Sequence, residues 1–302
     1  MRVDISRRDT LKAIIEIGSN NTKTHVYDGE KLVYDSNTTI EFKKNYKDRV
    51  ADSDLEKLFT VIEKAQEYAD NTHIFGCSIF RTINQGELKA INDELTARFN
   101  TNIQVVSQED EALYTALGCY KDIDYDKELC VFIGGGGSIE LIFVKNKEVV
   151  DKKFYDFGVV DVTNKFPDLK NDIPSSTFEE VTSYVAGLIE DIDQKADLLI
   201  LAGGDHLYWY NNANYKLLEN DLYSSANQPY MITQEMNDKY DRDAMLTSLE
   251  AIRARSDNPL WFDCSRAMKM ITNSVAKKID AKYVVPTRIN MEDGIKEHLS
   301  NI

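Results

Sequence analysis

The sequence predicts an α/β protein built from two related domains. One strand–turn–strand pattern occurs twice: residues 13–28 read AIIEIGSNNTKTHVYD, and residues 130–144 read CVFIGGGGSIELIFV. Short apolar runs also alternate with segments of helical periodicity in both halves, which is typical of α/β folds. The two copies lie too far apart for a solenoid, whose repeats recur every ~20–50 residues. We expect domains at 1–124 and 125–302, with a cleft between them that the two glycine turns face.

The elements of the first half follow from their residue patterns. Leu58 and Ile62 fall on one face of a helix that the Asp52-Ser53-Asp54 segment can cap. Further helices are expected from Gly86 and from Ser107, where acidic residues suit the positive end of the helix dipole. Runs of apolar and β-branched residues predict strands at 12–17, 22–26, 31–34, 72–77 and 103–106.

The second half continues with the same alternation. After the second strand–turn–strand unit, a short run at 149–150 and a turn at Gly158 are expected. The aromatic run Tyr208-Trp209-Tyr210 is interpreted as core packing, with stacking on a nucleotide base as the alternative. Strands are predicted at 198–201 and 283–285, and helices at 233–254, at 258–279, after the cap at 175–177, and from about residue 290. We expect the last helix to pack back onto the first domain.

Composition limits the classes of function. With 302 residues, 42% of them hydrophobic and 29% charged, the chain is typical of a soluble globular protein. A formal net charge of −15 repels nucleic acid and anionic membranes, so we expect neither as a partner. The cysteines form no CxxC pair and the histidines show no ligand spacing, which argues against a zinc site. No signal-peptide segment or long apolar run is present, so a cytoplasmic location is expected.

The glycine turns are the candidate binding elements. Glycine lets backbone N–H groups approach a ligand closely, and a turn between two strands can form a nest of donors for phosphate oxygens. The alternative is a hairpin turn without a ligand. The first turn contains Gly18, Ser19 and Asn20; the second contains Gly135, Gly136, Gly137 and Ser138; a third strand-to-glycine junction contains Gly203 and Gly204.

Taken together, these motifs resemble those of the exopolyphosphatase/guanosine pentaphosphate phosphohydrolase (Ppx/GppA) family, within the actin-like ATPase superfold of sugar kinases and heat-shock proteins. The resemblance extends from about residue 13 to residue 299 and implies two actin-like, ribonuclease H-like domains. The matching segments are IEIGSNNTK at 15–23, GCSIFR at 76–81, SQEDEA at 107–112, IGGGGSIE at 133–140, FGVVDVTNKF at 157–166, AGGD at 202–205 and YVVPTRINMEDG at 283–294.

The resemblance also implies roles for particular residues. Glu111 falls where the family positions its attacking water, and Glu140 falls at the acidic residue near the metal and the phosphate. Such a site would use Mg²⁺ or Mn²⁺, with Glu16 and Glu140 supporting the metal. Family members are often dimers, so a homodimer is expected. The implied phosphate-binding residues are Gly18, Ser19, Asn20, Lys23, Arg81, Gly135, Gly136, Gly137 and Ser138.

Four positions depart from the family pattern. Ile133 stands where the family has a metal-binding aspartate, and no acidic residue lies between positions 129 and 139. Glu16 replaces the aspartate of the first loop. Asp161 and Asp205 add negative charge where the family has polar or basic residues. Losing a carboxylate ligand should weaken magnesium binding, which puts catalysis in question without affecting the fold.

Three functions remain open at this stage. The first is a phosphoanhydride hydrolase that releases the terminal phosphate of polyphosphate or of a nucleotide polyphosphate. The acidic charge favours a short polyphosphate or a nucleotide over a long polymer. The second is a catalytically impaired relative that binds nucleotide or phosphate as a sensor. The third is another branch of the superfold, an acyl or sugar kinase, for which no hydroxyl-substrate motif is found.

Overall fold

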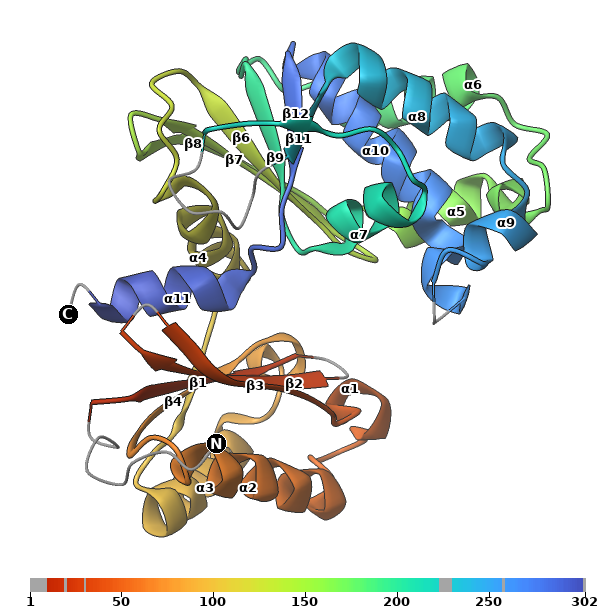
Figure 1. Cartoon of the computed structure of the whole chain (residues 1–302). Coiled ribbons are helices and arrows are strands. Elements are labelled where there is room, and N and C mark those ends of the chain that lie inside the picture. The colour runs from red at the N-terminus through yellow and green to blue at the C-terminus, as the bar shows by residue number, and fades with distance from the viewer. Residues whose placement is uncertain (1–9, 19–20, 30, 223–229, 257–258, 301–302) are drawn as a thin grey trace. The chain divides into compact units, whose positions relative to one another are not determined.

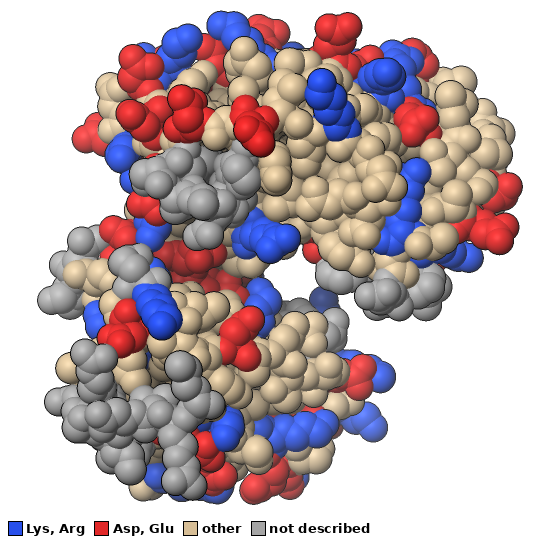
Figure 2. All heavy atoms as spheres, in the orientation of Figure 1, with Lys and Arg blue, Asp and Glu red and all other residues tan. Residues whose placement is uncertain are grey.

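The structure of the protein, a computed structural model, describes residues 10–18, 21–29, 31–222, 230–256 and 259–300 (Figure 1). The chain forms two compact units. The first comprises Met1–Glu111 with His298–Ile302, and the second comprises Ala112–Glu297. On the face shown in Figure 2, acidic and basic side chains are interspersed over the surface of each unit.

The first unit is built on a five-stranded sheet in the order β3-β2-β1-β4-β5. The first three strands form an antiparallel meander, whereas β4 runs parallel to β1 and β5 runs parallel to β4. The strand predicted at 12–17 is confirmed. The strands are β1 Lys12–Ile17, β2 Asn21–Asp28, β3 Lys31–Thr39, β4 Asn71–Gly76 and β5 Ile103–Val105.

The helices of this unit pack against the sheet through their apolar faces. Leu58 and Ile62 of α2 are fully buried, as the helical spacing predicts, and they pack in one cluster with Ile15 and Ile17 of β1. The helical segments are α1 Phe42–Asn45, α2 Asp52–Gln66, the 3₁₀ turn η2 Ser78–Arg81, and α3 Gln85–Phe99.

The second unit repeats this plan in a seven-stranded sheet, in the order β10-β11-β12-β9-β6-β7-β8. Its β6-β7-β8 meander corresponds to β1-β2-β3, and β9 and β12 add in parallel as β4 and β5 do. The duplication read from the sequence is therefore confirmed. The strands are β6 Leu129–Gly134, β7 Ile139–Lys145, β8 Glu148–Tyr155, β9 Leu198–Leu201, β10 Leu218–Glu219, β11 Tyr230–Thr233 and β12 Tyr283–Pro286.

Both faces of the second sheet are covered by helices. Helix α4 packs on one face through Ala112, Ala116 and Cys119, while α6, α8 and α10 contribute to the core on the other (Figure 1). The helical segments are α4 Gln108–Tyr120, α5 Val159–Lys165, η3 Pro167–Lys170, α6 Phe178–Leu188, α7 Asp205–Asn212, α8 Gln234–Leu246, α9 Leu249–Arg253, η4 Pro259–Cys264, α10 Ser265–Lys278 and α11 Met291–Ser300.

The division between the units falls at Glu111–Ala112 rather than at the predicted 124–125. The reason is the apolar face of α4, which packs with Leu129 and Val131 of the second sheet. The end of α11 is grouped with the first unit, where Lys12 Nζ donates to the carbonyl of Leu299 at 2.7 Å. The boundary predicted at 124–125 falls in the loop between α4 and β6, whereas the packing of α4 sets the division between the units.

The long helix predicted at 233–254 is wrong, because the chain breaks between α8 and α9. Thr247 is extended, with φ −81° and ψ 133°, and the Ser248 side chain caps α9 by accepting from the N–H of Ala251 at 3.1 Å. The helix predicted at 258–279 is likewise a 3₁₀ turn followed by α10. None of the described helices is long and apolar enough to cross a membrane.

Candidate functional site

The parallel strands of the first sheet end at a common edge. Ile17 pairs with Gly76, and Gly76 pairs with Val105, so the segments that follow β1, β4 and β5 leave the sheet side by side. Ligands of open α/β sheets bind outside the carboxyl ends of such strands. This edge carries the first glycine turn, η2 and the start of α4. Of the predicted turn, Gly18 is described, whereas Ser19 and Asn20 lie outside the described residues.

Arg81 and Glu111 meet at this edge. Arg81 ends η2, and its Nε donates to the carbonyl of Val106 at 2.7 Å while Nη2 donates to Glu111 Oε2. Glu111 lies in the first turn of α4, and its side chain is 37% exposed against 26% for Arg81. The backbone thus anchors the guanidinium, which in turn orients a carboxylate that water can reach.

Glu16 and Lys23 form a second charged pair. They are direct cross-strand neighbours in β1 and β2, and Lys23 Nζ lies 3.1 Å from Glu16 Oε2. Side chains in such opposite positions contact each other directly, so the pair follows from the register. The predicted phosphate ligand Lys23 is therefore bound to the predicted metal ligand Glu16.

Cys77 is a buried thiol at the same edge of the sheet. The buried thiol follows β4, and its pKa is raised by burial first and then by the negative charges of Glu111 and Glu16, while Arg81 acts in the opposite direction. Because its pKa is raised, the thiol stays protonated at neutral pH and is a poor nucleophile.

The second glycine loop joins β6 to β7. The N–H of Gly135 donates to the carbonyl of Ser138 at 3.0 Å and closes the turn. The N–H groups of Gly136, Gly137 and Ser138 donate to no acceptor in the described part of the chain. Three consecutive backbone donors in one exposed turn form the kind of nest that binds phosphate oxygens.

Helix α5 holds this loop in place. Val159 N–H donates to the carbonyl of Gly135 at 3.2 Å, and Val160 N–H donates to the carbonyl of Gly136 at 2.9 Å. Gly158 makes this contact possible, because a Cβ there would lie 2.5 Å from the Gly135 oxygen. The loop carbonyls are thus engaged by α5.

Asp161 has a structural explanation in the same helix. Its Oδ2 accepts from the N–H of Gly158 at 2.9 Å, so it caps α5. At the third junction, Gly203 and Gly204 have φ of 101° and 85°, a conformation that favours glycine, and they lead from β9 into α7. Asp205 begins α7, where its charge suits the helix dipole.

Glu140 is buried behind the second loop. It is 6% exposed, and its Oε1 accepts from the Ser138 hydroxyl at 2.8 Å. Its direct partner across the sheet is Ile133, which packs against a hydrophobic cluster of the unit. The loop therefore presents one carboxylate beside an apolar side chain, where the family resemblance leads us to expect two carboxylates.

The residues present do not form a preformed metal site. Among the described residues, no group of three or more His, Cys, Asp or Glu side chains is placed to hold a cation. Glu16 and Glu111 are each paired with a basic residue, and Glu140 has Ile133 as its neighbour. Magnesium needs a near-octahedral set of oxygen ligands. The described residues do not supply such a set.

Comparison with known proteins decides the family. The model of the Ppx/GppA phosphatase family matches residues 31–247, most of the chain. The chain belongs to this family. The crystal structure of the Aquifex aeolicus Ppx/GppA family member has a TM-score of 0.78 at 16% identity, over 97% of this chain and 98% of that one.

Further solved structures agree with the Ppx/GppA assignment at the level of the fold. An exopolyphosphatase from Cytophaga hutchinsonii has a TM-score of 0.70 at 12% identity, over 96% of this chain and 98% of that one. A second Aquifex aeolicus structure, a type II variant, has a TM-score of 0.77 at 16% identity, over 95% and 98%. A search of curated proteins found no match. The predicted fold of two actin-like domains is confirmed.

Proposed function

We propose that this Ppx/GppA family member hydrolyses the terminal phosphoanhydride bond of a small polyphosphate compound. The observation that carries the proposal is the Arg81–Glu111 pair, because it combines a fixed cation with a carboxylate that water reaches. Phosphoryl transfer requires positioning and charge stabilisation more than covalent chemistry from the protein. An oriented carboxylate and a fixed guanidinium are suited to those two tasks.

In the proposed reaction, Glu111 accepts a hydrogen bond from the attacking water and aligns its oxygen with the terminal phosphorus. The new P–O bond forms as the bridging P–O bond breaks, which yields orthophosphate and a chain shortened by one phosphate. Within the first unit, Arg81 would offset the charge on the phosphate oxygens, because its Nε is fixed by the carbonyl of Val106. In the second unit, the N–H groups of Gly136, Gly137 and Ser138 offer further donors to phosphate oxygens. Donors fixed by the backbone need no reorganisation during the reaction.

The proposed substrates are a short polyphosphate or a nucleotide polyphosphate. The Cytophaga hutchinsonii structure is described as an exopolyphosphatase, and a further similar structure as an exopolyphosphatase-like protein. The net charge of −15 favours a compact substrate, because a long polyanion is repelled over more of the surface.

A phosphate-release assay on the purified protein tests this proposal. Tripolyphosphate, long-chain polyphosphate, guanosine pentaphosphate and ATP are compared at equal phosphate-end concentration, each with magnesium, with manganese and with EDTA. We expect the highest kcat/KM on tripolyphosphate or on guanosine pentaphosphate. If none of the four compounds released phosphate under any of these conditions, the proposal would be contradicted.

Ile133 favours a second candidate, a relative that binds phosphate without turnover. Its apolar side chain stands opposite Glu140, at the position where the family resemblance leads us to expect a carboxylate. If this alternative is correct, the native protein binds the compounds but releases no phosphate. The Ile133→Asp variant then gains magnesium-dependent phosphate release. Turnover by the native protein would exclude the alternative.

A further inference from the structure

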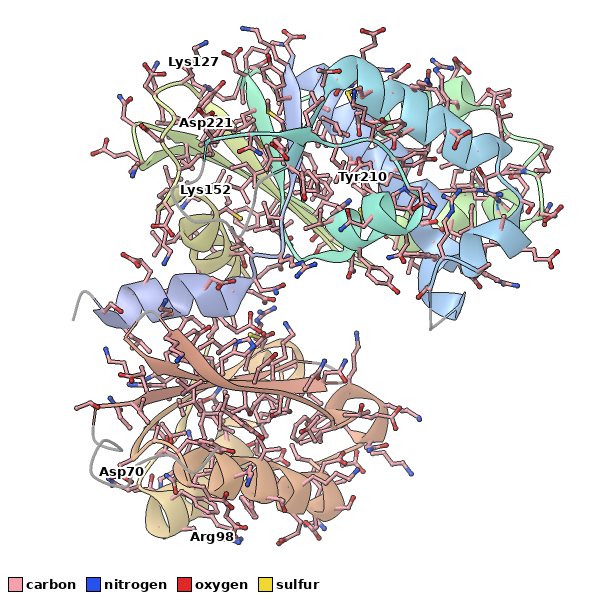
Figure 3. The ribbon with its side chains drawn as sticks, in the orientation of Figure 1. Asp70, Arg98, Lys127, Lys152, Tyr210 and Asp221 are labelled. Atoms are coloured by element: carbon pink, nitrogen blue, oxygen red, sulfur yellow. The ribbon has the colours of Figure 1, made fainter. Side chains whose placement is uncertain are left out.

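Two carboxylates at the edge of the first sheet, where β1, β4 and β5 end, are each in contact with a basic side chain of the same unit. Glu16 and Lys23 stand directly opposite each other in β1 and β2, which are neighbours in a sheet whose side chains project from both faces (Figure 3). Lys23 Nζ lies 3.1 Å from Glu16 Oε2, and Glu111 Oε2 accepts from Arg81 Nη2. Each carboxylate therefore already has a cation beside it.

In the first pair, the basic side chain is more accessible to water than the acidic one. The Lys23 side chain is 33% exposed, whereas that of Glu16 is 12% exposed. An anion that approaches the pair can contact the lysine directly. A metal ion that approaches it must displace the ammonium group before it can bind the carboxylate.

The charges of these side chains sum to zero. Glu16 and Glu111 contribute two negative charges. Lys23 and Arg81 contribute two positive charges. The neighbouring Cys77 adds none, because burial raises the pKa of its thiol and keeps it protonated. Protein sites attract divalent cations through uncompensated carboxylate charge, which this group of side chains does not offer.

A metal ion that arrives with the substrate meets the same obstacle. Magnesium usually binds through one or two carboxylates together with phosphate oxygens of the substrate. Here Glu16 or Glu111 becomes a metal ligand only if its basic partner moves away. Nor do the parts of the chain that the structure describes bring three or more His, Cys, Asp or Glu side chains together around a point that could hold a cation. The edge is therefore better suited to a phosphate group than to a metal ion.

We propose that Lys23 and Arg81 supply the positive charge that a divalent metal ion supplies in other phosphoryl-transfer sites, so that this protein acts on its phosphoanhydride without a metal. The inference rests on the proposed function and names the cations that this function uses. Ammonium and guanidinium groups bind phosphate oxygens through charge-assisted hydrogen bonds. Because Glu16 holds Lys23, and the Val106 carbonyl holds Arg81, both cations are in place before a substrate binds.

Manganese binding to the purified protein tests this without any turnover. Electron paramagnetic resonance measures the free Mn²⁺ that remains after the protein is added. We expect the native protein to show no saturable, one-to-one binding of Mn²⁺. Saturable binding that the Glu16→Gln variant abolishes would overturn the inference, because it would place a metal ion at the carboxylate that Lys23 contacts.

Phosphate release from tripolyphosphate in EDTA is the second arm of the test. The kcat/KM of the native protein in EDTA should lie within about threefold of its value with magnesium, and Lys23→Met should lower it at least about tenfold. Lys23→Arg keeps the charge and should retain most of the rate. Lys31→Met is the matched control at the opposite end of the β2–β3 hairpin, and it should stay within about twofold of the native protein.

The folding of each variant is checked by circular dichroism. If Lys23→Met does not fold, because it leaves Glu16 half-buried without its cation, the double variant Glu16→Gln/Lys23→Met removes both charges and decides instead. It should show the same loss of kcat/KM in EDTA.

Phosphate release that requires magnesium or manganese overturns this inference and leaves the proposed function standing. Unchanged kcat/KM in the Lys23 variants also overturns it. A native protein that releases no phosphate under any condition contradicts the proposed function itself, and this inference then fails with it. The three results are distinguishable in one set of assays.

Discussion

Lys269 and Asp241 lie fully buried on the neighbouring helices α10 and α8, yet no hydrogen bond or ion pair joins them. Each keeps one polar atom without a partner in the described structure, Nζ in the lysine and Oδ1 in the aspartate. Buried charges of this kind cost stability unless they are paired or bound by a ligand. The two residues are therefore expected to lower the stability of the second unit's core.

Asp241 should make the stability of the protein depend on pH. Burial raises its pKa to about 7, against an unfolded value of about 3.9. Between these values the folded state binds more protons than the unfolded state, so the contribution present below about pH 4 is lost as the pH rises through 7. We expect the free energy of unfolding of the native protein, relative to Asp241→Asn, to fall by up to about 4 kcal/mol over this range.

Urea unfolding at pH 4.5, 6 and 7.5 measures this difference. The native protein and Asp241→Asn should diverge as the pH changes, because the variant has no titrating group at this position. Two curves that stay parallel from pH 4.5 to 7.5 would show that Asp241 has an ordinary pKa.

Arg266 should be among the most important single residues for the stability of the second unit. The residue is 1% exposed, and its guanidinium donates to carbonyls of two separate stretches, 169–172 and 244–247, which makes it an internal crosslink. Removing it leaves several buried acceptors without donors, at ~1–3 kcal/mol each. The acceptors are the carbonyls of Leu169, Asn171, Asp172, Ala244 and Thr247.

We expect Arg266→Met to lower the free energy of unfolding by at least about 3 kcal/mol. The matched control is Arg253→Met, because Arg253 forms a 2.7 Å ion pair with Asp263 near the surface, and its removal should destabilise the protein much less. Thermal unfolding of the two variants compares them directly. Equal losses would mean that the carbonyl network does not stabilise the core.

Gly158→Ala should damage the second glycine loop specifically. The added Cβ would lie 2.5 Å from the Gly135 oxygen, so α5 and the loop must separate. We expect phosphate release to fall at least tenfold and stability to fall by ~1–3 kcal/mol, as in other overpacked sites. Gly187→Ala in α6 is the control, since a Cβ added there would meet no atom within 4 Å. It should keep full activity, and a similar loss in both variants would contradict the assigned role of the loop.

The fold was largely predictable because it depends on patterns that are local in the sequence. The runs around Gly18 and around 134–137 specify two meanders, and each acquires parallel strands in the same order. The apolar stripe of α2 also fixed which residues enter the core. The division between the units was not predictable in this way, because it depends on which sheet α4 covers.

The site residues named from the sequence remain a prediction, and the pairings among them could not be predicted from the sequence. Arg81 contacts Glu111 because the turn after β4 lies next to the helix that follows β5. The spacing of these residues in the sequence does not predict this contact. The burial of Lys269 could not be predicted from the sequence either, because a lysine within a helix is usually exposed. Its burial follows from the packing of α10 against its neighbours.

In the proposed reaction, Glu111 orients the attacking water. The most direct test is phosphate release by Glu111→Gln beside Glu109→Gln, which removes one charge from an exposed residue of the same helical turn. A carboxylate that orients water typically contributes ~10²–10⁴-fold to the rate. We predict a fall of at least a hundredfold in kcat for Glu111→Gln with little change in KM, and near-native rates for Glu109→Gln. Equal rates in the native protein and Glu111→Gln would contradict the account.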